Sequence, residues 1–200
     1  MTRRHCTGTK VGVSVPVNGA YPLDPTDIHF QAKQPHNILP TVVTFSKIDT
    51  AIGHDSPVKG NDGSLETFRW FKLAALSSTP GSDGQVKSLS GETVKPAQEL
   101  LDIFLSQLHL KIHNWLSTKY PWLDHRCQEI DYVFSVPSIV GLEGAAILVE
   151  RAKACNFETI KSKHKVFDVV LTEPEAAGAF VIYKMATDLG LKVGQPLRIA

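Results

Sequence analysis

The sequence predicts an α/β fold in which helices flank a mixed β-sheet. Strand-like and helix-like segments alternate between residues 131 and 189, a pattern that indicates crossover connections between parallel strands. Short strand-like segments separated by turn residues open the chain and predict antiparallel neighbours. Between these two parts, residues 96–118 carry apolar side chains at helical spacing and predict one long helix.

The opening segments read as a three-stranded meander. Valines alternate with small or polar residues over Val11 to Val17, and Asn18-Gly19 follows with turn chemistry. Asp27 to Phe30 is expected to form a second strand. The β-branched run Leu39 to Phe45 is expected to form the third.

The middle of the chain predicts a smaller inserted subdomain. Residues 46–64 are polar and rich in glycine, which indicates a surface loop, and residues 77–93 read as a flexible connection. The predicted long helix at 96–118 follows. We therefore expect an inserted subdomain at 46–124 within a core subdomain built from 1–45 and 125–200.

The last third of the chain contains two strand-then-helix units. The first pairs a strand at 131–136 with a helix at 142–154, and the second pairs a strand at 167–172 with a helix at 174–189. Pro174 falls in the first turn of the second helix, where the missing N–H is tolerated. Another apolar run begins at Pro196 and reaches Ala200. We therefore expect the fold to be incomplete at its C-terminus.

Composition restricts the classes of partner. The 200 residues carry a formal charge of +1, so the chain lacks the excess positive charge that favours binding to nucleic acid or an anionic membrane. No apolar stretch is long enough to predict a transmembrane helix. The three cysteines are odd in number and far apart, which favours a reducing compartment, so we expect a cytoplasmic protein.

Two strand ends carry the most informative motifs. Val136-Pro137 ends one predicted strand, and Thr172-Glu173-Pro174 ends the next before an alanine-rich helix. Upstream, the Pro-Thr-Val run within Leu39–Val43 and the aromatic-lysine segment Phe68–Leu73 complete the pattern. In order and spacing these motifs resemble the actin-like (ribonuclease H-like) ATPase domain of the seventy-kilodalton heat-shock chaperone family. The likeness is to the N-terminal lobe of divergent, mostly fungal members.

The resemblance implies ATP or ADP with Mg²⁺ as cofactor and assigns two catalytic residues. Glu173 matches a carboxylate that orients metal-bound water near the γ-phosphate. Lys72 matches a lysine that stabilises charge developing on the transferred phosphate. Each has a structural alternative: Glu173 would favour the helix dipole beside a Thr172–Glu175 capping box, and Lys72 would extend into solvent from an aromatic strand.

The resemblance also assigns an allosteric proline. Pro137 matches a residue that couples the nucleotide state to movement of the lobes, whereas its structural alternative is simple strand termination. Family members often place a basic residue eight positions later, where this chain has Ala145. The coupling is therefore not assigned to this chain.

The first phosphate loop of the family is altered here. Gly12 and Val13 match its trailing residues and Thr9 matches a threonine, so these three are the candidate nucleotide-binding residues, but His5 stands at the position of the metal-organising aspartate. The second phosphate loop would begin after Ala200. We therefore expect little activity from this chain alone.

Two other functions compete with the ATPase prediction. A non-catalytic protein-interaction module derived from the same fold is the alternative, and client polypeptides or co-chaperones are the implied partners in both cases. A sugar kinase with the same superfamily fold is disfavoured by the Val-Pro and Glu-Pro spacing.

His109 and His113 stand four residues apart on the long helix. That spacing suits a metal pair, but no third ligand is evident, so we expect solvent exposure and predict no metal site. We expect Trp115, Tyr120 and Trp122 to lie in the core.

Overall fold

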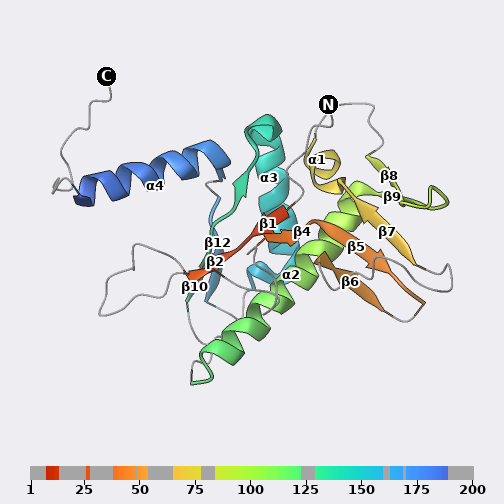
Figure 1. Cartoon of the computed structure of the whole chain (residues 1–200), viewed down its shortest axis with the longest axis horizontal. Coiled ribbons are helices and arrows are strands. Elements are labelled where there is room, and N and C mark those ends of the chain that lie inside the picture. Colours follow the sequence, from red (N-terminus) through yellow and green to blue (C-terminus); the bar gives the residue numbers. More distant parts are fainter. Residues whose placement is uncertain are drawn as a thin grey trace.

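The computed structural model is a mixed α/β structure of small sheets with flanking helices. It describes residues 8–13, 26–27, 38–47, 49–53, 65–77, 84–122, 129–159, 163–168 and 170–188. The long helix α2 (Ala97–Lys119) runs diagonally across the molecule, and α4 (Glu173–Asp188) extends away from the remaining elements (Figure 1).

Short antiparallel strand pairs open the chain. Their bounds and partners are β1 (Gly8–Lys10) with β4 (Ile38–Pro40), and β2 (Gly12–Val13) with β3 (Thr26–Asp27). The antiparallel pairing is confirmed for these residues, but the meander is not: among the described residues, β4 pairs with β1 instead of β3, and the two pairs form separate sheets. The other parts of the first two predicted strands, 14–17 and 28–30, lie outside the described residues.

A three-stranded antiparallel sheet follows, with β5 (Val42–Phe45) between β6 (Thr50–Ile52) and β7 (Glu66–Arg69). The prediction that residues 46–64 form only a surface loop is therefore wrong at β6. That strand is too short to show an alternating pattern, and its pairing with β5 buries Ile52. The predicted third strand is divided between β4 and β5 at Thr41.

The expected flexible connection at 77–93 is also partly wrong. Residues 85–87 form β8 (Gln85–Lys87), which pairs antiparallel with β9 (Val94–Pro96). Ser88 lies in the intervening turn, where its backbone N–H donates to the carbonyl of Thr93 at 2.8 Å. Polar residues here form hydrogen bonds with the backbone of a hairpin turn. A hairpin of this composition looks like a flexible segment when only the sequence is considered.

Helix α2 confirms the predicted long helix. Its apolar face is buried along its full length, and the buried residues are Ala97, Leu100, Leu101, Phe104, Leu105, Leu108, Ile112 and Leu116. This face packs against α1 (Phe71–Leu76), α3 (Gly141–Ala152) and the β5–β6 part of the three-stranded sheet. The expectation that Trp122 lies in the core is wrong, because its side chain is 77% exposed, whereas Trp115 and Tyr120 are half-buried.

The two predicted strand–helix units are confirmed, but their strands differ from the prediction. The strand expected at 131–136 is divided in two. Of the described residues in the strand expected at 167–172, only 171–172 form a strand, and a separate strand precedes them at 164–166. The resulting parallel pairs are β10 (Ile130–Tyr132) with β12 (His164–Val166), and β11 (Ser135–Val136) with β13 (Leu171–Thr172). The 3-10 turn η2 (Ser138–Val140) precedes α3, and the π-helical turn η3 (Lys153–Phe157) follows it. The exposed side chain of Val133 marks the break between β10 and β11.

One cluster of buried apolar residues includes side chains from the antiparallel sheet, the helices and the parallel strand pairs. It includes Val43 of β5, Leu76 of α1, Leu100 of α2 and Leu148 of α3. Gly144 lets α3 approach the C-terminal end of α1 closely, because it has no Cβ. In the part of the chain that the structure describes, no helix combines the length and the apolar character needed to cross a membrane.

Candidate functional site

The β11–β13 pair brings two of the predicted site residues to the same end of the two strands. These strands are parallel, with Ser135 opposite Leu171 and Val136 opposite Thr172. The residues that follow in this register are Pro137 and Glu173. Pro137 leads into η2 and α3, and Glu173 is the first residue of α4, so both positions lie at the carboxyl end of the pair.

The predicted capping box is present at the start of α4. The backbone N–H and the hydroxyl of Thr172 donate to Oε2 of Glu175 at 2.8 and 2.7 Å, and the Glu175 N–H donates back to the hydroxyl at 3.3 Å. These hydrogen bonds from the Thr172 backbone and side chain hold the pKa of Glu175 below its ordinary value. The box therefore fixes where α4 begins, and with it the backbone position of Glu173.

We expect the helix content of α4 to depend on pH through Glu175. Because its pKa is lowered in the folded protein, the unfolded chain binds the proton first as pH falls below 4.5. The stabilisation is complete above that pH and is lost as pH falls through the lower pKa of the folded state. Far-UV circular dichroism from about pH 6 to about pH 3 should show this loss in the wild type.

Glu175→Gln keeps an oxygen acceptor for Thr172 but does not titrate, so its helix signal should change less over the same pH range. Glu150→Gln, at an exposed position of α3, is the matched control and should behave as the wild type. Equal pH profiles for all three proteins would contradict a role for the capping box.

The candidate nucleotide-binding residues lie on the first strands. Thr9 is half-buried in β1, and its hydroxyl lies 3.3 Å from the hydroxyl of buried Thr41. Gly12 and Val13 form β2, opposite Asp27 and Thr26 of β3. These residues therefore sit on antiparallel pairs, separate in the strand pairing from the β11–β13 edge.

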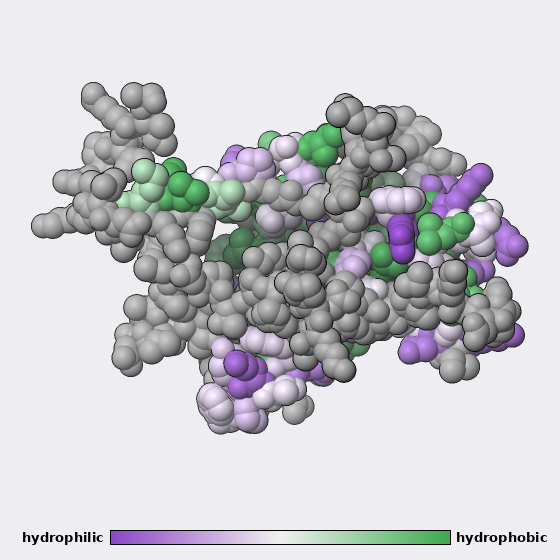
Figure 2. All heavy atoms as spheres, in the orientation of Figure 1, coloured by the Kyte–Doolittle hydropathy of each residue, from purple (hydrophilic) through white to green (hydrophobic). Residues whose placement is uncertain are grey.

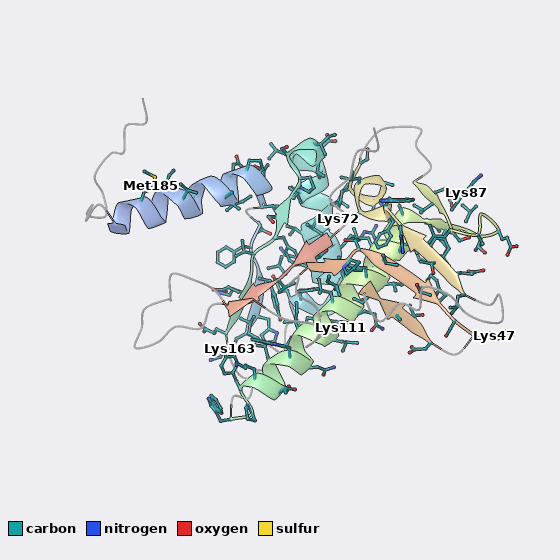
Figure 3. The ribbon with its side chains drawn as sticks, in the orientation of Figure 1. Lys47, Lys72, Lys87, Lys111, Lys163 and Met185 are labelled. Atoms are coloured by element: carbon teal, nitrogen blue, oxygen red, sulfur yellow. The ribbon has the colours of Figure 1, made fainter. Side chains whose placement is uncertain are left out.

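Lys72 lies on α1 rather than on a strand, and its side chain is half-buried (Figure 3). Helix α1 packs against α3, the helix that follows Pro137. The position eight residues after Pro137 is also on α3, and Ala145 is buried there in the core. A basic side chain would not fit at that position without repacking.

A second constellation was not predicted. His109 and His113 of α2 meet His164 of β12, and one potential ligand atom from each lies within 4.8 Å of the others. The expectation of two solvent-exposed histidines is wrong: both are half-buried, and Nε2 of His109 is buried with no hydrogen-bond partner. The reason is that the rings of Tyr132, Phe157 and His164 lie against this face of α2.

Aromatic groups surround the three histidines. The rings of Phe157 and His109 are 4.9 Å apart, and the hydroxyl of Tyr132 lies 3.0 Å from Nε2 of His113. Burial lowers the pKa of His109, and the nearby charge of His164 lowers it further. Burial raises the pKa of Tyr132. These shifts favour a neutral imidazole at His109 and a protonated phenol at Tyr132 near neutral pH.

Two of the three histidines in this cluster could be grouped from the sequence alone. The spacing of His109 and His113 places both on one face of a helix. His164 lies on a strand far along the chain, and only the β10–β12 pairing and its packing on α2 bring it close.

Comparison with known protein families finds no match to this chain, and comparison with curated proteins finds none either.

Proposed function

We propose that this chain is the ATP-binding lobe of an actin-like ATPase domain related to the seventy-kilodalton heat-shock chaperones. The observation that supports this most is that Pro137 and Glu173 directly follow two paired parallel strands, at the same end of the pair. The resemblance predicts functional residues at these two strand ends. In α/β sheets, ligands bind outside the carboxyl ends of the strands.

The described donor groups do not by themselves fit magnesium-ATP. Mg²⁺ prefers oxygen ligands from one or two carboxylates together with substrate phosphates. Glu173 directly follows β13, but the hydroxyl of Thr9 lies 3.3 Å from that of Thr41, and His5 stands where the family has an aspartate. Nucleotide contacts from one lobe are also only part of a complete site. We therefore propose weak nucleotide binding and little hydrolysis by this chain alone.

Calorimetric titration with magnesium-ATP tests the proposal. We expect weak, saturable binding by the wild type and a further loss of affinity in both Lys72→Ala and Glu173→Ala. Lys72→Ala removes a positive charge that the resemblance assigns to the phosphate, and Glu173→Ala removes a carboxylate that it assigns to the water bound to Mg²⁺. Lys87→Ala, at an exposed position of β8, is the matched control and should bind as the wild type. Circular dichroism must first show that all four proteins are folded.

A folded wild type that does not bind would contradict the nucleotide-binding proposal. Binding that survives both Glu173→Ala and Lys72→Ala would also contradict the proposed site, because the nucleotide would then lie elsewhere on the chain.

A non-catalytic interaction module is the second candidate, and the exposed apolar side chains favour it. Ile139 of η2 is 82% exposed and Leu142 of α3 is 89% exposed. Apolar side chains also gather along α4 (Figure 2), where Val181, Ile182 and Met185 are exposed. Exposed apolar groups of this kind mark surfaces that contact another protein. Client polypeptides or co-chaperones are the partners that this candidate implies.

A further inference from the structure

We propose that His109, His113 and His164 form a binding site for a divalent transition metal ion, with zinc as the ion that fits best. The site lies between α2 and β12 and does not involve the residues assigned to nucleotide. Its test therefore stands or falls independently of the proposed ATPase function.

The positions of the three imidazoles carry the proposal. His109 and His113 are four residues apart on α2, so they face the same side of the helix, and their ring centroids are 4.3 Å apart. The ring of His164 lies 5.4 Å from that of His113. One potential ligand atom from each residue already lies within 4.8 Å of the other two.

The spacing requires only a small contraction to hold zinc. Zinc–nitrogen bonds are about 2.0–2.1 Å long, so two nitrogens on a tetrahedral ion lie about 3.3 Å apart. One potential ligand atom from each histidine lies within 4.8 Å of the other two, so reaching this spacing shortens each separation by at most about 1.5 Å. The ring of His164 already lies 5.4 Å from that of His113, so the third ligand is next to the helical pair.

The buried nitrogen of His109 supports a ligand at this place. Its Nε2 is inaccessible to solvent and has no hydrogen-bond partner. A buried polar nitrogen without a partner is unfavourable, and coordination to a metal ion would satisfy it.

The neighbouring groups suit a metal-bound histidine cluster. The Tyr132 hydroxyl, 3.0 Å from Nε2 of His113, orients that ring in the way that outer-shell partners orient metal ligands. Phe157 is fully buried and packs against the rings of both His109 and Tyr132, at 4.9 Å in each case. This apolar wall limits access of water to one side of the site.

The set of ligands selects the class of ion. Among the described residues, no cysteine or carboxylate joins the three imidazoles. Mg²⁺ and Ca²⁺ require oxygen ligands, whereas imidazole suits zinc, copper and nickel. Three histidines complete three positions of a tetrahedral zinc ion and leave the fourth for water or another small ligand.

The test is a zinc titration of the full chain, in competition with a chromophoric chelator and without nucleotide. We expect one ion per chain and a higher thermal midpoint in the presence of zinc, because only the folded chain brings His164 to α2. Cobalt should give the visible d–d absorption of a tetrahedral site. Tyr132→Phe should weaken zinc binding by about 10–100-fold, as is usual for an outer-shell partner.

His113→Gln and His164→Gln should abolish the one-to-one binding and the cobalt absorption. His36→Gln is the matched control, because the chain has eight histidines and any of them could bind zinc nonspecifically. His113 is half-buried, so its variant decides the test if His164→Gln does not fold.

A folded wild type that binds no zinc would overturn the proposal. It would also be overturned if His113→Gln bound as tightly as the wild type, or if His36→Gln lost the binding instead. Loss that is confined to the variants of the cluster would establish the site.

Discussion

Phe71→Ala is expected to lower the free energy of unfolding by about 3–5 kcal/mol. Phe71 is the first residue of α1, its side chain is fully buried, and its ring lies 6.0 Å from that of Phe104 on α2 in an edge-to-face arrangement. Truncation removes buried apolar surface and leaves a cavity where α1 meets α2. The rigid backbones of the two helices prevent the cavity from closing.

Urea denaturation monitored by circular dichroism measures this effect. Leu142→Ala is the matched control, because Leu142 is also a large apolar residue on a helix but is almost fully exposed. Its free energy of unfolding should stay within about 0.5 kcal/mol of the wild type. Equal losses in the two variants would contradict the assignment of Phe71 to the core.

Gly144→Ala should also destabilise the protein, by about 1–3 kcal/mol. A Cβ at this position would lie 2.3 Å from the carbonyl oxygen of Leu76 and 2.3 Å from Cγ1 of Val140. The first of these is a backbone atom at the end of α1, so relief requires the two helices to move apart. That cost exceeds the gain of about 0.5–1 kcal/mol that alanine normally brings to a helix.

Gly178→Ala provides the matched control in α4. A Cβ there would meet no atom within 4 Å, so only the helix-propensity gain remains and stability should be unchanged or slightly higher. Both variants are measured by the same urea titration. A neutral Gly144→Ala would mean that α1 and α3 do not approach each other as closely as described.

Regular, long patterns could be predicted from the sequence because each has a local cause. The apolar spacing of α2 and the Thr172–Glu175 capping box both operate within one helix, and both are present. The turn at Pro137 after a strand is similarly local. These features need no knowledge of the neighbouring elements.

Short strands could not be predicted because their stability comes from their partners. Residues 50–52 form β6 only through pairing with β5, and the β8–β9 hairpin arises in a segment whose composition suits a flexible connection. Residue type alone also fails to predict burial. Tryptophan is usually largely buried, but Trp122 lies beyond the end of α2 and is exposed.

The candidate sites divide in the same way. The sequence predicted that Pro137 and Glu173 end consecutive strands, and the parallel pairing of β11 with β13 places both at the carboxyl end of this pair. The role of Glu173 in nucleotide binding stays a prediction. The histidine cluster depends on tertiary packing between α2 and β12, so the helical pair His109 and His113 could not reveal its third member.

The central position of α2 also determines how cooperative the molecule is. This helix contacts α1, β5, β6 and β9 as well as α3 and η3, so its opening would remove a packing partner from nearly every other buried element. Its backbone amides should therefore exchange with solvent only when the whole structure unfolds. Helix α4, which projects from the body and meets chiefly β11 and β13, can open while the rest stays folded. Among the described residues, we therefore expect strong protection of the amides of α2 and weak protection of those of α4, the helix that begins at Glu173.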